Sequence, residues 1–170
     1  MNVCMIGTGY VGLVSGACFA EFGVQVVCAD NDEAKVAALR SGTVPIYEPG
    51  IEGLVERNVS QGRLSFTTDT AEAIRSSLVV FIAVSTPSLP DGSTDLTMVE
   101  AVAREIGRAM DGYKVVVTKS TVPVGTSAKV RGWIEEELAA AGREVRFSVA
   151  SNPEFLREGA AIGDFMRPDR

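Results

Sequence analysis

Three glycines spaced as G-x-G-x-x-G stand near the start of the chain, in the segment GTGYVG. Gly7 would permit a tight turn, Gly9 would let the backbone approach a pyrophosphate, and Gly12 would allow close packing of a helix on a strand. A helix that begins here presents free N–H groups and its positive dipole end to an anion. The spacing predicts a phosphate-binding loop, although similar glycine-rich turns also occur in folds that bind no nucleotide.

An acidic residue, Asp30, follows the next apolar run of the sequence. A carboxylate at this position can accept both ribose hydroxyls of an adenosine. Asn31 and Asp32 come next, so no arginine is placed to bind a 2′-phosphate, and NAD is predicted in preference to NADP. Lys35 lies one turn into the following helical segment, where it could reach the ribose or the phosphates or could equally be a solvated lysine.

Polar loops follow three later apolar runs of the chain, at residues 85–87, 119–123 and 151–158. The first two combine hydroxyl side chains with proline, and such turns can offer small donors to a nicotinamide ribose or a substrate hydroxyl. The third holds Glu154 and Glu158 on either side of an apolar pair and an arginine, so a general base and an anion clamp could stand together. Ordinary turn chemistry remains open as the alternative for the first two loops, and an acidic helix start for the third.

The composition narrows the possible chemistry. The chain has 170 residues, no histidine, and a formal net charge of −6 from 16 Lys and Arg and 22 Asp and Glu. Without histidine, Ser-His and Cys-His catalysis and the usual zinc sites are excluded, which leaves acid–base work to carboxylates, Lys, Tyr or bound water. The negative charge opposes non-specific binding to nucleic acid or to anionic membranes. No metal, nucleic-acid or membrane partner is therefore predicted.

The three cysteines, Cys4, Cys18 and Cys28, have no disulfide-framework spacing. The first residues lack the basic head and the cleavage site of a secretory signal. The longest apolar run, residues 78–84, is far shorter than the roughly 20 residues that span a bilayer. A cytoplasmic protein is expected, in which each cysteine is a small buried hydrophobe rather than a catalytic thiolate.

Short apolar, β-branched runs alternate with segments of helical period, and these elements must position the polar loops. The first, fourth and fifth runs are apolar on both faces, which predicts central strands covered by helices on both sides. The fold class is predicted to be α/β, Rossmann-like and doubly wound, with a mainly parallel six-stranded sheet in the order 3-2-1-4-5-6 and helices on both faces. The predicted strands are residues 2–6, 24–29, 64–67, 78–84, 114–118 and 146–150, with helices at 13–22 and within 47–62.

Longer motifs carry a resemblance to a known family. In chain order they are GTGYVGLVSGACFAEFG, ADND, PIYEPGIEGLV, VSTPS with DGSTDLTMVE, KSTVPVGT and SNPEFLREGAAIGDFMRPDR. Over essentially its whole length, the chain resembles the N-terminal domain of the UDP-glucose/GDP-mannose dehydrogenase family. Within that family, PIYEPG and the closing RPDR are more similar to the UDP-glucose enzymes than to the GDP-mannose enzymes.

The resemblance implies an NAD-dependent, four-electron oxidation of UDP-glucose to UDP-glucuronate through aldehyde and thioester stages. Glu154 matches the family glutamate that activates water for thioester hydrolysis, and Thr121 matches the residue that helps to position this water. The segment along the sugar nucleotide is implied to be Glu154, Phe155, Leu156 and Arg157. The residues implied at the cofactor are Gly7, Gly9, Tyr10, Val11, Gly12, Asp30, Lys35, Thr86, Thr121 and Glu158.

The resemblance also implies features that this chain does not contain. In the family, the nucleophilic cysteine, a central helix and the UDP-binding C-terminal domain belong to a later region. Residues 1–170 are therefore expected to form one NAD(P)-binding Rossmann domain that does not turn over alone. The longer enzyme is expected to be a homo-oligomer, and these residues by themselves a monomer. Two other interpretations stay open: a dehydrogenase of GDP-mannose or of a UDP-hexosamine, and a non-catalytic NAD-sensing module.

Overall fold

The computed structural model describes residues 1–168, so Asp169 and Arg170 of the RPDR motif lie outside the described residues. Its centre is one six-stranded sheet in the order β3-β2-β1-β4-β5-β6, in which every neighbouring pair is parallel. The predicted fold class and strand order are confirmed, and each strand lies within two residues of its predicted bounds. The strands are β1 (Asn2–Ile6), β2 (Gln25–Ala29), β3 (Leu64–Thr67), β4 (Val79–Ile82), β5 (Lys114–Thr118) and β6 (Phe147–Ser151).

Helices cover both faces of the sheet, because the central strands are apolar on both sides. In β1, Val3 and Met5 belong to one apolar cluster, and Cys4 and Ile6 belong to the other. This alternation is the period of a strand that is buried on both faces. The helices are α1 (Tyr10–Glu21), α2 (Glu33–Arg40), α3 (Ile51–Ser60), α4 (Thr70–Arg75), α5 (Thr97–Ala109), α6 (Thr126–Ala140) and α7 (Ala161–Met166).

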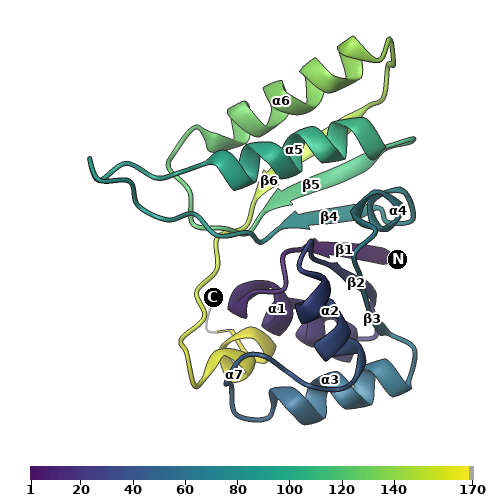
Figure 1. Ribbon diagram of the computed structural model, residues 1–170, viewed down its shortest axis with the longest axis vertical. Coiled ribbons are helices and arrows are strands. Elements are labelled where there is room, and N and C mark those ends of the chain that lie inside the picture. Colours follow the sequence, from purple (N-terminus) through teal and green to yellow (C-terminus); the bar gives the residue numbers. More distant parts are fainter. Residues whose placement is uncertain (169–170) are drawn as a thin grey trace.

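The two apolar clusters divide the helices between them. Helices α1, α2, α3 and α7 pack in the cluster of Val3 and Met5, whereas α4, α5 and α6 pack in the cluster of Cys4 and Ile6. Figure 1 shows β4–β6 with α5 and α6 in the upper half, and β1–β3 with α1, α2, α3 and α7 in the lower half. The sheet therefore joins two mononucleotide-sized halves, and β1 and β4 meet where the strand order reverses.

Helix α1 begins at Tyr10, three residues before the helix that the apolar period predicts. Gly9 is its N-cap residue, and the Gly9 carbonyl accepts a hydrogen bond from the Leu13 N–H at 2.9 Å. Glycine is a poor helix former, so the segment that contains Gly12 gives a weak helix signal in the sequence. The first helical turn is therefore part of the glycine loop itself.

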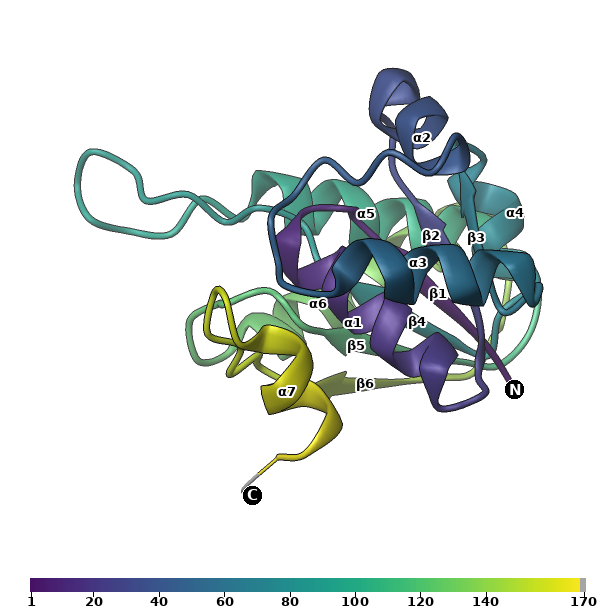
Figure 2. The ribbon, with the colours of Figure 1, turned by 90° about the horizontal axis from the view of Figure 1, so that it is seen from below.

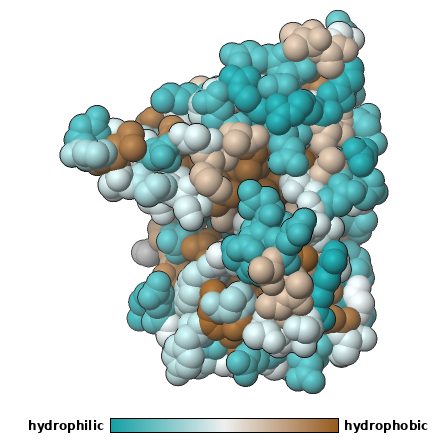
Figure 3. Space-filling model, viewed as in Figure 1, coloured by the Kyte–Doolittle hydropathy of each residue, from teal (hydrophilic) through white to brown (hydrophobic). Residues whose placement is uncertain are grey.

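A long arm separates β4 from α5 and stands away from the rest of the molecule, as Figures 2 and 3 show. Its two strands are held together by an antiparallel bridge between Ser88 and Thr94, and the Leu89 N–H donates to the Ser93 carbonyl at 2.7 Å. At the other end of the chain, α7 packs on α1, where the rings of Phe165 and Phe19 meet edge to face at 5.0 Å. None of the helices in residues 1–168 has the length and apolar character needed to cross a bilayer.

Candidate functional site

The glycine loop has the geometry that its spacing predicts. Gly7 adopts a φ of +103°, and a Cβ atom there would lie 2.4 Å from the Ala83 carbonyl oxygen. A Cβ atom on Gly12 would lie 1.9 Å from the Gly7 carbonyl oxygen, so neither position accepts a side chain. At Gly9, by contrast, an added Cβ would meet no atom within 4 Å. Gly7 and Gly12 are required by the fold, whereas Gly9 borders open space that a ligand can enter.

Asp30 is held in place by four hydrogen bonds at the end of β2. Its Oδ2 accepts from the Thr8 N–H at 2.8 Å, from the Thr8 hydroxyl at 2.7 Å and from Lys35 Nζ at 3.0 Å. Its Oδ1 accepts from the Asp32 N–H at 3.0 Å. Burial opposes ionisation, but the hydrogen bonds from Thr8, Asp32 and Lys35 outweigh it and hold the pKa of Asp30 below its ordinary value.

Lys35 reaches Asp30 because of how α2 begins. Asp32 is the N-cap residue of this helix, and its side chain accepts a hydrogen bond from the Lys35 N–H at 3.0 Å. This cap sets the Lys35 side chain one helical turn from the β2 end, where its Nζ pairs with Asp30. The structure thus places the half-buried Lys35 side chain at the acidic residue, and its contact with the ribose or the phosphates stays a prediction.

Two hollows flank the glycine loop at the carboxyl edge of the sheet, and both are bordered by Gly9 and by residues 83–85. One, of about 270 Å³, also contains Gly7, Asp30 and Lys35. The other, of about 220 Å³, also contains Tyr10, Val11, Thr86, Lys119, Thr121 and Glu154. A dinucleotide lying across Gly9 would have one half in each hollow, which is the arrangement expected at a topological switch point.

The loops after β4 and β5 are joined to each other in the second hollow. The Thr86 hydroxyl donates to the Thr121 carbonyl at 2.9 Å, and the Ser120 hydroxyl donates to the Val84 carbonyl at 2.7 Å. Glu154 enters the same hollow from the loop after β6, where its Oε2 accepts from the Leu156 N–H at 2.7 Å. The structure therefore brings together three loops that the sequence predicts to meet at one edge.

A third hollow, of about 680 Å³, adjoins the second one and is lined by Phe155, Leu156 and Arg157. The Arg157 guanidinium pairs with Asp164, with Nη2 to Oδ1 at 2.7 Å, and this pair joins the loop to α7. Glu158 lies near Tyr10, and its charge contributes to the raised pKa of that side chain. Glu158 is exposed and lines none of these three hollows of the described chain.

Lys119 is a site residue that the sequence analysis did not single out. It lies directly after β5 and lines both the second and the third hollow, yet its side chain is 4% exposed. Its Nζ donates to Asn152 Oδ1 at 3.3 Å and lies 5.6 Å from the centre of the Phe165 ring. Burial lowers the pKa of Lys119, and the charge of Glu154 opposes that shift. The feature of the sequence that could have pointed to Lys119 is its position directly after an apolar run.

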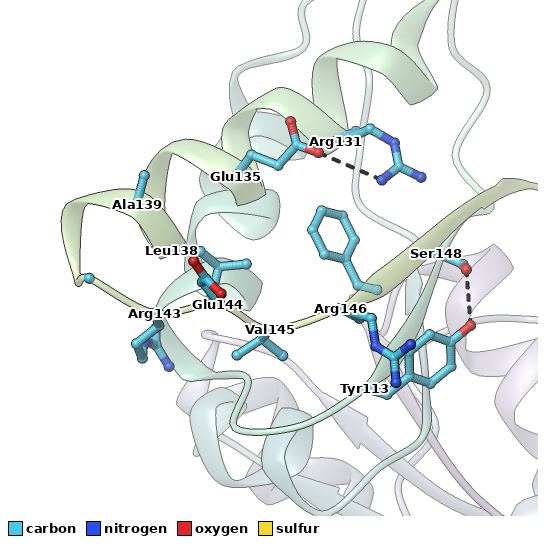
Figure 4. A pocket seen from close by; sticks show the side chains of 12 residues that line it. Tyr113, Arg131, Glu135, Leu138, Ala139, Arg143, Glu144, Val145, Arg146 and Ser148 are labelled. Carbon is cyan, nitrogen blue, oxygen red and sulfur yellow. Dashed lines mark hydrogen bonds and ion pairs between the residues drawn. The ribbon is translucent and has the colours of Figure 1, made fainter.

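A hollow larger than these three lies elsewhere in the described chain. It encloses about 930 Å³ beside the first residues of β5 and β6, where Tyr113 and Ser148 share a hydrogen bond of 2.9 Å (Figure 4). Arg131 and Glu135 lie one turn apart on α6 and pair along one wall of it, with Nη1 to Oε1 at 3.7 Å. Because it lies at the opposite ends of these strands from the glycine loop, it contains none of the predicted site residues.

Comparison with known proteins decides the family. All of residues 1–170 match the NAD binding domain of the UDP-glucose/GDP-mannose dehydrogenase family. The chain belongs to this family. It is 58% identical over 171 residues to UDP-glucose 6-dehydrogenase of Rhizobium meliloti, and 55% identical over 169 residues to UDP-glucose 6-dehydrogenase TuaD of Bacillus subtilis. The match covers 100% and 99% of this chain but only 38% and 36% of those proteins.

Solved structures of the family have the same fold. A UDP-glucose dehydrogenase from Pyrobaculum islandicum is 48% identical with a TM-score of 0.91, and the match covers 99% of this chain and 39% of that one. A GDP-mannose dehydrogenase from Pseudomonas aeruginosa is 41% identical with the same TM-score of 0.91, over 99% of this chain and 39% of its own. The chain thus spans well under half the length of these family members.

The cofactor of the matched family domain is NAD, as the sequence predicts. The residues present fit this cofactor, because Gly9 leaves room for a pyrophosphate and Asp30 presents an ionised acceptor in the adjoining hollow. The three cysteines of this family member are fully buried, and burial raises the pKa of Cys18 and of Cys28 to about 12. Residues 1–168 contain no group of three or more His, Cys, Asp or Glu that could hold a metal.

Proposed function

We propose that the full-length protein oxidises UDP-glucose to UDP-glucuronate with NAD, and that this chain supplies the NAD site and the glutamate for the hydrolytic step. The observation that carries the proposal is the position of Glu154 in one hollow with Tyr10 and Val11 of the glycine loop and with Thr121. The carbon that is oxidised must lie next to the nicotinamide end of a dinucleotide site. A carboxylate beside this end can therefore act as a general base at that carbon. The names of the most similar relatives support UDP-glucose as the substrate.

In this function the glycine loop, Asp30 and Lys35 hold the adenosine and pyrophosphate half of NAD. Thr86 and Thr121 would complete the site at the other half, next to Tyr10, and Glu158 would join them from its exposed position outside the hollow. When bound here, NAD would supply the hydride acceptor for two successive oxidations, so two NAD would be reduced for each alcohol that becomes a carboxylate. The role of the chain in both oxidations is to orient the cofactor and exclude water.

The hydrolytic step uses Glu154 as a general base toward water, which Thr121 positions. The proton removed from water goes to the carboxylate, the new C–O bond forms at the thioester carbon, and the C–S bond breaks to release a thiolate. Phe155, Leu156 and Arg157 line the adjoining hollow, where they would lie along the sugar nucleotide. Lys119 places a cation between the two hollows, beside the position where negative charge develops on the carbonyl oxygen.

The thiol nucleophile of this proposal comes from a later region of the full-length protein. The burial of Cys4, Cys18 and Cys28 supports this assignment, because a nucleophilic cysteine needs access and a lowered pKa. Residues 1–170 then form an NAD-binding domain that binds cofactor but does not turn over substrate without the remaining domains. We further propose that the complete enzyme is a homo-oligomer.

A related sugar nucleotide is the second candidate for the substrate. The GDP-mannose dehydrogenase of Pseudomonas aeruginosa matches this chain with the same TM-score, 0.91, as the UDP-glucose dehydrogenase of Pyrobaculum islandicum. The NAD site and Glu154 would serve a GDP-mannose or UDP-hexosamine dehydrogenase in the same way.

The deciding experiment measures NADH formation by the full-length gene product with UDP-glucose, GDP-mannose and UDP-N-acetylhexosamines, each offered with NAD and with NADP. The expected result is two NADH for each UDP-glucose consumed, with little from the other sugar nucleotides or from NADP. A preference for another sugar nucleotide would transfer the proposal to that substrate. Tight NAD binding without turnover on any of them would contradict an enzymatic function and favour an NAD-sensing module.

A further inference from the structure

Glu48 is a buried carboxylate that none of the roles above uses. It lies in the PIYEPG motif just before α3, where its side chain is only 4% exposed. A carboxylate this deeply buried costs free energy unless hydrogen bonds compensate for the lost water. Its hydrogen-bond partners therefore indicate what the residue does.

These partners come from two distant segments of the chain. The Tyr10 hydroxyl, at the first residue of α1, donates to Glu48 Oε2. The same oxygen accepts from the Gly159 N–H at 2.7 Å, and Oε1 accepts from the Ile162 N–H at 3.4 Å. Tyr10 lies 38 positions before Glu48, whereas Gly159 and Ile162 lie 111 and 114 positions after it. One carboxylate thus joins the glycine loop to the turn that begins α7.

The charge states of this cluster suit that connection. Burial opposes ionisation of Glu48, but the hydrogen bonds from Tyr10, Gly159 and Ile162 prevail and keep its pKa below the ordinary value. Burial and the hydrogen bond to Glu48 raise the pKa of Tyr10 to about 12. At neutral pH the tyrosine therefore remains a donor and Glu48 remains an acceptor for all of its partners.

Both ends of the connection adjoin functional positions. Tyr10 lines the same hollow as Glu154, and Gly159 directly follows Glu158. The other end of this loop is fixed separately, because Asn152 accepts a hydrogen bond from Lys119 Nζ and its N–H donates to the Thr118 carbonyl at 2.9 Å. The loop that carries Glu154 and Glu158 is therefore anchored to β5 at its start and to Glu48 at its end.

We propose that Glu48 is a positioning residue that couples NAD binding at the glycine loop to the placement of the Glu154–Glu158 loop. The role of this loop in hydrolysis rests on the proposed function, whereas the effect of Glu48 on cofactor binding does not. Removing the negative charge leaves the Gly159 N–H, the Ile162 N–H and the Tyr10 hydroxyl with a weaker acceptor. Because Glu48 holds both the loop and Tyr10, this one substitution leaves both of them free to shift.

The test measures NADH affinity by fluorescence, and kcat and KM, for the full-length protein with Glu48→Gln, Tyr10→Phe and both changes together. Groups that share one hydrogen-bond network give non-additive effects. We expect Glu48→Gln to weaken NADH binding by about tenfold, as for loss of a charged hydrogen bond, and to lower kcat as well. Tyr10→Phe is expected to weaken NADH binding less, and the double variant to equal Glu48→Gln.

Two control variants separate positioning from stability. Glu52→Gln makes the same chemical change at an exposed position of α3 and should leave both measurements unchanged. Val55→Ala removes buried apolar volume from α3 and should lower the thermal midpoint without changing NADH affinity. The proposal is overturned if Val55→Ala reproduces the effects of Glu48→Gln, or if the effects of Glu48→Gln and Tyr10→Phe on NADH affinity simply add. If the protein oxidises none of the sugar nucleotides, the NADH measurements still decide the role of Glu48.

Discussion

At the Asp30 end of the dinucleotide site, a carboxylate that is 8% exposed accepts four hydrogen bonds, two of them from Asp32 and Lys35 close by in the chain and two from Thr8. At the Glu154 end, Lys119 and Ser120 are buried, but the other side chains of the polar loops after β4, β5 and β6 are half-buried or exposed, and Phe155 is 64% exposed. The first end is thus complete before cofactor binds, whereas the second borders the wide hollow that a substrate would fill. We infer that the part of the site that would bind adenosine is preformed and rigid, whereas the part that would hold the reacting groups can adjust its conformation.

The contacts at the two ends also differ in sequence separation. The most distant hydrogen-bond partner of the Asp30 carboxylate is Thr8, 22 positions away. At the other end, Thr86 and Thr121 are 35 positions apart, and Lys119 and Asn152 are 33 apart. Contacts between distant segments cost more loop-closure entropy and depend on the whole sheet being formed. Substitutions at the Asp30 end should therefore change affinity and stability, while those at the Glu154 end should mainly change turnover.

The largest expected effect is on hydrolysis, from Glu154→Gln in the full-length protein. Loss of a general base typically slows a step by about 10²- to 10⁴-fold. Because the two oxidations precede hydrolysis, the variant should release a burst of about two NADH per active site and then stall, with NADH affinity unchanged. Rapid-mixing absorbance at 340 nm checks this, with Glu52→Gln as the control, and steady turnover at the normal rate would remove Glu154 from the mechanism.

Two glycine substitutions within one loop distinguish a glycine that the fold requires from a glycine that ligand binding requires. Gly12→Ala places a Cβ atom 1.9 Å from a backbone oxygen and should cost roughly 3 kcal/mol of unfolding free energy, with loss of NADH binding. Gly9→Ala meets no atom within 4 Å and should change stability by less than about 0.5 kcal/mol. It should nevertheless weaken NADH binding strongly, because the added methyl group occupies the ligand side of the loop. Denaturant unfolding and NADH titration of both variants provide the comparison, and unchanged NADH affinity in Gly9→Ala would refute a pyrophosphate at this position.

The pH dependence of the unfolding free energy of Asp30→Asn tests how much the Asp30 carboxylate stabilises its end of the site. The pKa of Asp30 is lowered in the folded state, so its ionised form stabilises the protein above the ordinary value of 3.8, and this contribution is lost as pH falls through the folded value. The variant should be about 2 kcal/mol less stable near neutral pH, as for loss of charged hydrogen bonds. The difference from the parent protein should shrink as the pH falls below about 4. Equal stability of the two proteins at pH 7 would mean that the carboxylate is not what holds Thr8 and Lys35.

Sequence reasoning predicted the fold and the Asp30 end of the site most completely. Apolar runs of β1, β4 and β5 are buried on both faces, so hydrophobic pattern alone determined the sheet, and the glycine spacing determined the loop. The role of Thr8 was missed, because a threonine between two glycines has no distinctive pattern. Its 22-residue separation from Asp30 is bridged only when β1 and β2 pair.

The contacts at the other end could not be predicted in the same way. Lys119 stands in a motif that the sequence singled out, but its burial depends on Asn152 and Phe165, which come from later elements. Glu48 similarly acquires Gly159 and Ile162 as partners only when α7 folds back on α1. The hydrophobic periodicity of a single helix or strand carries no information on these long-range contacts. The roles assigned to Thr121, Glu154 and Glu158 came from family resemblance rather than from their residue types.

The smallest expected effect concerns Lys119, which lies between the two hollows of the reacting end. Burial lowers its pKa, so keeping it charged in the folded state costs stability at neutral pH. Lys119→Met retains the apolar stem without the charge and should raise the unfolding free energy by about 1 kcal/mol. Because the pKa of Lys119 is lowered in the folded state, the parent lysine loses its proton before the pH reaches the ordinary value of 10.5, and the gain should fade as the pH rises toward that value. A loss of stability at neutral pH would show that Asn152 and Phe165 stabilise the ammonium group by more than its burial costs, and that this end of the site is as firmly built as the Asp30 end.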